Sequence, residues 1–232
     1  MNIQSFARRF VLALSAVVAL CSGPSVLATT VTLVPTGFAN GSEPFNVSVP
    51  TVVDPSALST GGFTGTIDGG PPITFFCFEL TQSFGFGGSG YTYDDSVLSG
   101  GQYTTLSELF TEAFATATLT TLNSAAFQLA VWEILEETTP VSLSPGGTQG
   151  SFYVTNDHGY TTTVAAANAL IAGLPSTGTY EIHLLSNANN QDFVYGTLPL
   201  RQVPEPAPLQ LIGAALVALL AMRRRIVARP LA

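Results

Sequence analysis

Polar and apolar residues alternate along two early segments of the chain. Residues 30–34 and 45–49 follow the two-residue period of half-buried strands. Glycine pairs at 61–62 and 69–70 enclose a segment around residues 63–67 and mark the turns of a hairpin region. This part of the chain is therefore predicted to be rich in β-structure.

The next segment, residues 73–80, is apolar almost throughout and rich in phenylalanine. A short run without alternation predicts a strand that is buried on both faces. On such a strand Cys77 shares a face with Ile73 and Phe75, and it points away from Phe76 and Phe78.

The middle of the chain changes to helical spacing. Thr105 and Glu108 have the spacing of a capping box, which predicts that a helix begins there. The apolar positions that follow recur every three or four residues, as on one face of a helix: Leu106, Leu109, Phe110, Ala113, Phe114 and Ala117.

Further helices and strands are predicted downstream. Asn123 or Ser124 can cap a second helix, which Pro140 ends. The remaining elements are a helix at 162–174, strands at 180–185 and 193–197, and surface loops at 85–90 and 142–150.

Together these elements predict the fold class α+β, a β-rich sandwich or barrel with a central helical insertion. We assign this exported domain to residues 29–200, a length that can bury a real core. Residues 1–28 and 201–232 differ from it in composition and are predicted to be targeting segments.

The first 28 residues have the pattern of a secretory signal peptide. Arg8 and Arg9 precede an apolar stretch at residues 10–20, and small residues precede a cleavage point after Ala28. The expected partner is a signal peptidase. The arginine pair leaves both the Sec and the Tat export routes open, and the strongly apolar core favours Sec.

The C-terminal segment combines a proline-locked tetrapeptide, an apolar run and a basic end. Val203, Pro204, Glu205 and Pro206 precede a predicted transmembrane helix at about 206–222, and Arg223, Arg224 and Arg225 follow it. The run is shorter than the usual span of about 20 residues. The three arginines argue against burial in a soluble core, and they place the body on the outer side of the membrane.

This order of features resembles the PEP-CTERM sorting signal of exported bacterial proteins, a tail also named the ice-binding protein C-terminal domain. The resemblance covers about the last thirty residues. It implies that an exosortase-type processing enzyme recognises Pro204, Glu205 and Pro206. It also implies a membrane-anchored intermediate, followed by delivery to the cell surface or the extracellular matrix.

The body between the targeting segments is strongly acidic. All fifteen acidic residues lie within 29–206, against Arg201 as the one basic residue there, which gives a formal charge near −14. Such a body repels nucleic acid, so nucleic-acid binding is excluded. The whole chain contains no lysine.

Cysteine usage isolates one thiol. Cys21 leaves with the signal peptide, and Cys77 is then the only cysteine in the body. An intramolecular disulfide is therefore impossible, and a single cysteine in an exported protein indicates a reactive thiol or another covalent fate.

Two short motifs resemble the paired motifs of bacterial thioester domains. They are Phe76-Cys77-Phe78 on the predicted strand and residues 127–132, which contain Gln128 and Trp132, on the second helix. In those surface adhesion modules a cysteine thiol condenses with a glutamine side chain and expels ammonia. The resemblance, over about residues 70–195, implies a thioester between Cys77 and Gln128 in a pocket of Phe76, Phe78 and Trp132. Gln191-Asp192-Phe193 also resembles a sequence near the end of such domains.

The chemistry of the pair agrees with this resemblance. A thioester is an acyl electrophile that survives only where water is kept away. Burial raises the pKa of a thiol, so formation of the bond needs a base, and Glu79 and Glu133 are the candidates. The bond can then be opened by an amine on a partner. The absence of lysine fits such a bond, and it also fits compositional drift in an acidic protein.

Each motif also has a structural interpretation, since a free cysteine packs as a small hydrophobe. The sequence therefore leaves two functions open, a covalent adhesin and a noncatalytic structural or biofilm matrix protein. No enzyme activity, catalytic residue, cofactor or metal site is predicted. His158, His183 and one sulfur cannot complete a structural zinc site without help from carboxylates. A hydrolase is a third alternative, without a Gly-x-Ser-x-Gly elbow. Asp94 and Asp95 are expected in a solvated turn.

Overall fold

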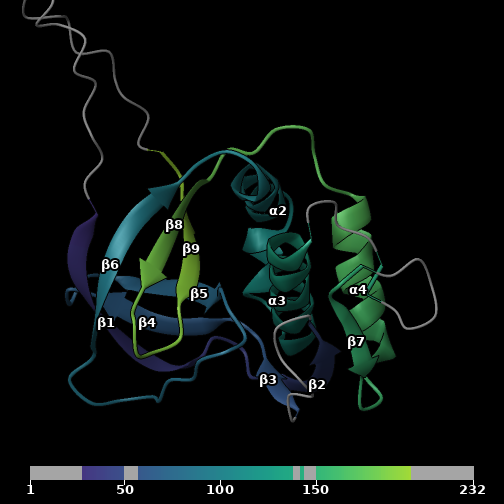
Figure 1. Cartoon of the computed structure of the whole chain (residues 1–232), viewed down its shortest axis with the longest axis horizontal. Helices are drawn as coiled ribbons and strands as arrows, with labels where there is room; N and C mark the ends of the chain where they lie inside the picture. The colour runs from purple at the N-terminus through teal and green to yellow at the C-terminus, as the bar shows by residue number, and fades with distance from the viewer. Residues whose placement is uncertain (1–27, 50–56, 138–141, 144–149, 200–232) are drawn as a thin grey trace, which may run out of the picture. The chain divides into compact units, whose positions relative to one another are not determined.

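The computed structural model describes residues 28–49, 57–137, 142–143 and 150–199. Six antiparallel strands close a barrel in the order β1-β4-β5-β9-β8-β6 (Figure 1). Their bounds are β1 Thr29–Phe38, β4 Phe63–Ile67, β5 Pro72–Cys77, β6 Tyr91–Leu98, β8 Glu181–Ser186 and β9 Phe193–Thr197.

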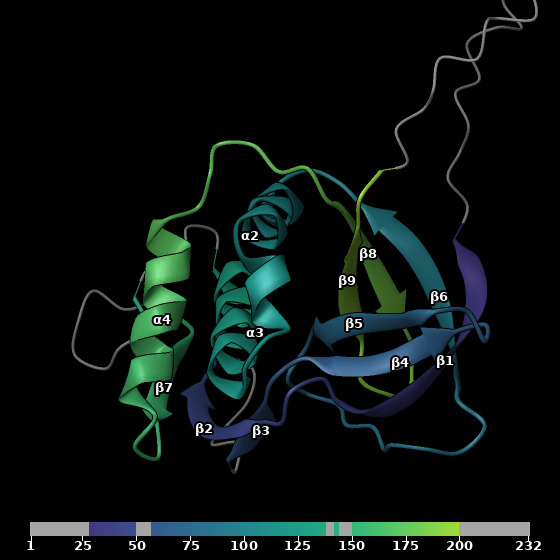
Figure 2. The same cartoon turned by 180° about the vertical axis from the view of Figure 1, so that it is seen from behind.

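A smaller sheet lies beside the barrel and contains three strands in the order β3-β2-β7. These are β2 Glu43–Ser48, β3 Leu58–Thr60 and β7 Tyr153–Asn156. The helices are α2 Gln102–Ala117, α3 Thr121–Glu136 and α4 Thr161–Ala172. Helix α3 packs against α2 on one side and α4 on the other, and it also contacts β5 (Figure 2).

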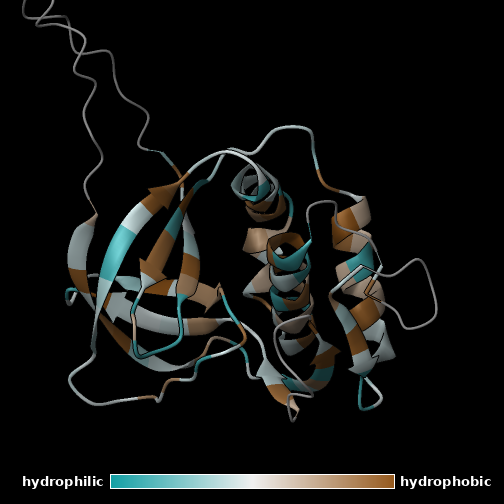
Figure 3. Cartoon of the chain, viewed as in Figure 1, coloured by the Kyte–Doolittle hydropathy of each residue, from teal (hydrophilic) through white to brown (hydrophobic). Residues whose placement is uncertain are grey.

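The core consists of two clusters of apolar side chains. One contains inward-facing residues of the barrel, among them Leu33, Phe75 and Phe193, together with residues of the smaller sheet and of α3 and α4. The other contains residues between the barrel wall and helices α2 and α3, among them Phe76 and Phe110. Apolar residues accordingly recur on both the strands and the helices (Figure 3). Strand β5 contributes to both clusters because its successive side chains alternate between the two faces.

The structure confirms the predicted mixture of strands and helices, with a barrel as the β-rich part. Five predicted strands correspond to β1, β2, β4, β8 and β9. The predicted strand at 73–80 ends at Cys77, and residues 85–90 belong to no helix or strand, as expected. Strands β3, β6 and β7 were not predicted.

The predicted helix starts need correction. Helix α2 begins at Gln102 after Gly101, which has φ 53° and makes no side-chain cap. Thr105 and Glu108 therefore lie inside the helix and form no capping box. Helix α3 is capped by Thr120, whose hydroxyl accepts the N–H of Asn123 at 3.1 Å, in place of the predicted Asn123 or Ser124.

Asp94 and Asp95 also need correction. They lie on β6 and pair with Ser186 and Leu185 of β8, where a solvated turn was predicted. The two charged residues obscured the alternating pattern of β6, a strand whose Tyr93 is buried in the barrel.

The two targeting segments fall almost wholly outside the described residues. This applies to the predicted transmembrane helix, the sorting motif from Val203 to Pro206 and the arginines at 223–225. Ala28, the predicted cleavage residue, is described and exposed just before β1. Within the described ranges, no helix has both the length and the apolar character needed to cross a membrane.

Candidate functional site

Helix α3 is buried on almost every side, which is why its sequence is apolar without a clear polar face. Its buried residues run from Ser124 to Ile134, and Gln128 among them has no exposed surface. A buried amide needs hydrogen-bond partners, because an unpaired polar group in the interior is costly. The partners of Gln128 therefore indicate why this residue lies in the core.

Gln128 forms two hydrogen bonds with the backbone of Cys77. The Cys77 N–H donates to Gln128 Oε1 at 2.8 Å, and Gln128 Nε2 donates to the Cys77 carbonyl oxygen at 3.0 Å. Since a backbone N–H can only donate and a carbonyl can only accept, this orientation of the amide is fixed. The structure thus joins the two residues that the sequence paired across 51 positions.

The position of these bonds follows from the strand register. Pairing of β4 with β5 reaches Phe63 opposite Phe75 and goes no further, while Phe76 and Cys77 pair with β9 on the other side. At Cys77, where β4 no longer pairs with β5, the Gln128 amide bonds the backbone N–H and C=O. The Gln128 side chain therefore makes the hydrogen bonds that a neighbouring strand would otherwise make with Cys77.

A pocket of about 310 Å³ lies beside Cys77. Trp132, one helical turn after Gln128, also lines it, with a side chain that is 3% exposed. Its other walls come mostly from the segment after β5, which contributes Glu79, Leu80, Gln82, Ser83, Phe84 and Phe86. The rest are Phe38 of β1, Leu58 and Ser59 of β3, and Gln191 just before β9. Because Ser83 and Phe86 are exposed, the pocket gives an outside molecule a path toward the thiol.

The electrostatics of the pocket act against a free thiolate. Burial raises the pKa of the Cys77 thiol strongly, and the negative charge of Glu79 raises it further. A thiol in this state is protonated at neutral pH and is inert as a nucleophile by itself. Any reaction of Cys77 therefore needs a group that accepts its proton.

Three buried polar atoms of the pocket residues have no hydrogen-bond partner. They are Glu79 Oε1, Gln82 Oε1 and Trp132 Nε1. The other oxygen of Glu79, Oε2, accepts the hydroxyl of Thr81 at 2.6 Å. The unpaired atoms are thus two acceptors and one donor, all buried in side chains that line the pocket.

Gln191 holds the pocket wall in place. Its side-chain Nε2 donates to the carbonyl oxygen of Glu79, and its backbone N–H donates to that of Ser83 at 3.4 Å. Its own carbonyl accepts the hydroxyl of Tyr93 at 2.9 Å. The resemblance of residues 191–193 pointed to this segment, but nothing in the sequence indicated that Gln191 fixes Glu79.

Phe76 and Phe78 do not line the pocket, although they were predicted to surround the thiol. Phe76 packs against Phe127 with ring centroids 4.5 Å apart, in the cluster under α2 and α3, and Phe78 packs at the edge of the same cluster. Phe76 lies on the face of β5 opposite Cys77 because side chains alternate along a strand, and Phe78, which follows the end of β5, packs on the same side as Phe76. The aromatic walls come from Phe38, Phe84, Phe86 and Trp132 instead.

The two candidate bases also differ in position. Glu79 lines the pocket with Cys77 and its charge acts on the thiol. Glu133 is fully buried and is not among the lining residues. The geometry therefore favours Glu79 as the base that serves this site.

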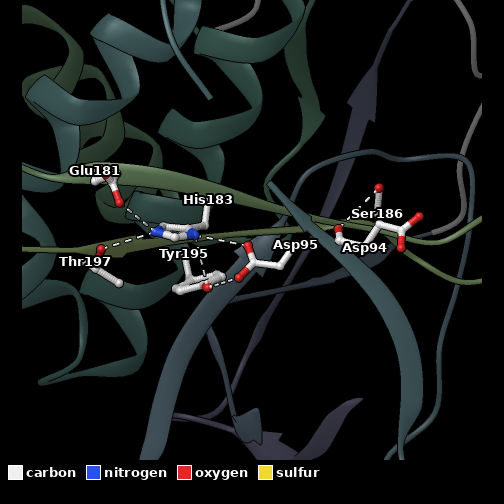
Figure 4. Close-up of polar contacts among 7 residues, drawn as sticks. All are labelled: Asp94, Asp95, Glu181, His183, Ser186, Tyr195 and Thr197. Carbon is white, nitrogen blue, oxygen red and sulfur yellow. Dashed lines mark hydrogen bonds and ion pairs between the residues drawn. The ribbon is translucent and has the colours of Figure 1, made fainter. Parts of the chain in front are cut away.

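A second polar cluster surrounds His183 (Figure 4). Its Nδ1 lies 3.0 Å from Asp95 Oδ1, and its Nε2 lies 3.2 Å from Glu181 Oε1 and 3.3 Å from Thr197 Oγ1. The hydroxyl of Tyr195 donates to Asp95 Oδ2 at 2.7 Å.

This cluster has the character of an ion pair. A hydrolytic triad would need a lone pair on His183 Nε2 to accept the Thr197 hydroxyl, but the Glu181 carboxylate faces the same nitrogen. Burial lowers the pKa of His183, but the hydrogen bond and charge of Asp95 and the charge of Glu181 outweigh it, so the pKa is raised. A protonated His183 donates to both carboxylates. Among the described residues, no three His, Cys, Asp or Glu side chains form a candidate metal site.

Comparison with known proteins identifies no family for this chain. No protein family model and no curated protein matches it. Among solved structures, the N-terminal domain of the Streptococcus pyogenes pilus tip adhesin Cpa superposes with a TM-score of 0.43 and 13% identity, covering 68% of this chain and 94% of that chain. The N-terminal thioester domain of the fibronectin-binding protein SfbI from Streptococcus pyogenes gives a TM-score of 0.38 and 11% identity, with 68% and 95% coverage. At these values the likenesses establish neither a shared family nor a shared function.

Proposed function

We propose that Cys77 and Gln128 condense into an internal thioester, and that the protein is a covalent adhesin that captures an amine-bearing partner. The observation that carries this proposal is the pair of hydrogen bonds between the Gln128 amide and the Cys77 backbone. These bonds hold the amide carbon beside the residue that bears the thiol. Proximity of this kind lowers the entropic part of the barrier to their reaction.

The reaction balances without any cofactor. The Cys77 sulfur attacks the Gln128 Cδ atom, a C–S bond forms, and the Cδ–Nε2 bond breaks. The nitrogen leaves as ammonia and takes the proton that the thiol gave up. One molecule of ammonia is lost, and no oxidant or reductant is needed.

The Cys77 N–H has a further use in this step. Attack on Cδ develops negative charge on Gln128 Oε1, and that oxygen already accepts the Cys77 N–H at 2.8 Å. A donor aimed in advance at a developing oxyanion is a large source of rate enhancement in acyl transfer. The backbone of Cys77 would therefore stabilise the intermediate that its own side chain creates.

Proton transfer falls to Glu79, which lines the same pocket. The strongly raised pKa of the Cys77 thiol means that a thiolate is not available at rest. Glu79 can accept the thiol proton during attack and return it to the departing nitrogen. Its free Oε1 is the atom available for this exchange.

The predicted targeting segments would deliver the protein to a place where such a reaction can occur. A signal peptide, the Val203–Pro206 motif, a membrane helix and three arginines would export the body, hold it briefly at the membrane and release it to the cell surface or matrix. Amines of other molecules are abundant there. A body without lysine would not consume its own electrophile.

Intact mass of the purified, folded protein tests the proposal. We expect wild-type protein to be lighter than its sequence by one ammonia, to resist thiol alkylation at Cys77, and to gain the mass of methylamine when treated with it. Cys77→Ala should show neither the deficit nor the adduct. A wild-type protein of full mass whose Cys77 is alkylated while folded would contradict the proposal and favour a noncatalytic matrix protein.

A further inference from the structure

The pocket beside Cys77 contains polar atoms that the fold leaves without partners. Trp132 Nε1 belongs to a side chain that is 3% exposed, and Glu79 Oε1 and Gln82 Oε1 are buried as well. All three residues line the same pocket as the thiol. Buried polar groups in proteins are nearly always paired, so three of them around one pocket indicate a ligand that supplies the partners.

Glu79 is fixed in position and has one oxygen to spare. Thr81 donates its hydroxyl to Glu79 Oε2 at 2.6 Å, and the Gln191 side chain holds the Glu79 backbone carbonyl. The remaining oxygen, Oε1, has no partner. No lysine exists in the chain, none of its few arginines lies among the described residues, and neither His158 nor His183 lines the pocket, so among the described residues no side chain supplies a cation for this carboxylate.

We propose that Glu79 selects the attacking group of the partner, binding a cationic primary amine through Oε1 and accepting the proton that the amine must lose before it attacks. This inference rests on the proposed thioester. It adds a specificity determinant, because an ammonium and a carboxylate are both charged, whereas a hydroxyl group brings no positive charge to the contact.

The partner's nitrogen loses two protons during the transfer, and each proton goes to a different acceptor. The partner enters as an ammonium and gives one proton to Glu79, which passes it to water. The free amine attacks Gln128 Cδ, a C–N bond forms, and the Cδ–S bond breaks. The second proton goes from the nitrogen to the leaving sulfur, which becomes the Cys77 thiol. The strong basicity of a buried thiolate makes this last step favourable.

The aromatic walls of the pocket fit the rest of such a partner. Phe84 and Phe86 lie with ring centroids 5.3 Å apart, and Phe86 is 49% exposed, at the solvent side of the pocket. An amine carried on an apolar stem can pack its stem there while its charged end reaches Glu79. Aromatic faces also attract cations, which adds to the same preference.

The test compares Glu79→Gln with a matched control variant in their reactions with two nucleophiles. Glutamine keeps the size of the side chain and removes its charge. Glu112→Gln removes the same charge from an exposed position on α2. The protein is treated at neutral pH with methylamine, which is a cation, or with hydroxylamine, which is largely uncharged, and the adduct is followed by intact mass.

Glu79 is also the proposed base of thioester formation, so we expect Glu79→Gln to acquire the ammonia deficit more slowly and still to reach it on prolonged incubation, because a general base changes the rate and not the end point. The molecules that carry the deficit should react with methylamine at least about tenfold more slowly than the wild type, since general bases commonly contribute more than this. Their reaction with hydroxylamine should change by less than about threefold, because that nucleophile needs no prior deprotonation. The methylamine rate of the variant should rise with pH in step with the free amine. Glu112→Gln should behave as the wild type in both reactions.

The outcomes separate this inference from the proposed function. If wild-type protein shows no ammonia deficit and no hydroxylamine adduct, the thioester itself fails. If the deficit is present and Glu79→Gln reacts with methylamine as fast as Glu112→Gln, the thioester stands and the role of Glu79 is wrong. A Glu79→Gln protein that never acquires the deficit would also overturn the inference, because it would hold no bond on which Glu79 could select an amine.

Discussion

Ser124 and Gln128 lie one turn apart on α3 and both bond the open backbone edge of the barrel. Ser124 Oγ accepts the Gly62 N–H at 2.7 Å, and Gln128 bonds the N–H and the C=O of Cys77. These bonds occur where β4 has stopped pairing with β5. Backbone groups buried at such an edge must be satisfied, so the helix completes the sheet with side chains. Gln128 therefore has a structural task besides its proposed chemistry.

The structural task can be measured apart from the thioester. In a Cys77→Ala background no thioester forms, and a further Gln128→Met substitution keeps the volume of the side chain while it removes both hydrogen bonds. The free energy of unfolding should fall by about 1–3 kcal/mol, because two buried backbone groups lose their partner. Urea denaturation of the single and double variants measures this difference.

Ser124→Ala in the same background is the matched comparison. It removes one bond to Gly62, so its effect should be smaller, on the order of 1 kcal/mol. Equal stability of Cys77→Ala and its Gln128→Met derivative would show that the amide contributes nothing to the edge of the barrel.

The parts of the fold that the sequence predicted are those with strong local patterns. The apolar face of α2, with Leu106, Leu109 and Phe110, is buried as its spacing indicated. The start of α2 was misplaced because Gly101 relies on backbone conformation, which leaves no side-chain signal. Strand β6 was missed because Asp94 and Asp95 obscure its alternation, and their partners are distant in sequence.

The candidate site was predicted in part for the same reason. Cys77, Gln128 and Trp132 come together as the motifs indicated. Phe76 was assigned to the pocket by its proximity in sequence, although strand alternation turns it to the other face. Gln191 acts on Glu79 across 112 positions, and a contact of that range has no local pattern.

Trp132 should protect the proposed thioester from water. Its indole N–H has no partner, so Trp132→Phe removes no hydrogen bond, but the smaller ring leaves room beside the sulfur. We expect hydrolysis to accelerate on the order of tenfold, about 1.4 kcal/mol in barrier height. Intact mass over time measures it as the gain of one water. The free energy of unfolding should fall by less than about 1.5 kcal/mol, and an unchanged hydrolysis rate would remove Trp132 from this role.

Substitution of Phe86 should change the order of amine reactivity, whereas substitution of Phe76 should not. Phe86 is 49% exposed at the pocket and its ring also packs against Phe38, Phe63 and Phe84, so Phe86→Ala should lower the free energy of unfolding by about 1 kcal/mol. It should slow the reaction with amines that carry an apolar stem more than the reaction with methylamine. Phe76→Leu should cost about 1–2 kcal/mol of unfolding free energy through loss of packing against Phe127, with no change in the order of amine reactivity. Comparing butylamine with methylamine on both variants measures this.

His183 should make stability depend on pH. The pKa of His183 is raised in the folded protein, because Asp95 and Glu181 favour its charged form more than burial opposes it. A raised pKa means that the stabilisation is fully present below the unfolded value of about 6.5. It is then lost as the pH rises through the higher folded value. The free energy of unfolding should therefore decline as the pH rises above about 6.5.

The comparison of His183→Gln with His158→Asn isolates this effect. His183→Gln removes the cation and should flatten the profile over that range, with its largest loss of stability at the acidic end. His158 is exposed and has φ 49°, a conformation that asparagine tolerates, so His158→Asn should keep the wild-type slope. Urea denaturation at each pH gives the three profiles. A wild-type slope that survives in His183→Gln would assign the pH dependence to other groups and contradict the proposed ion pair with Asp95 and Glu181.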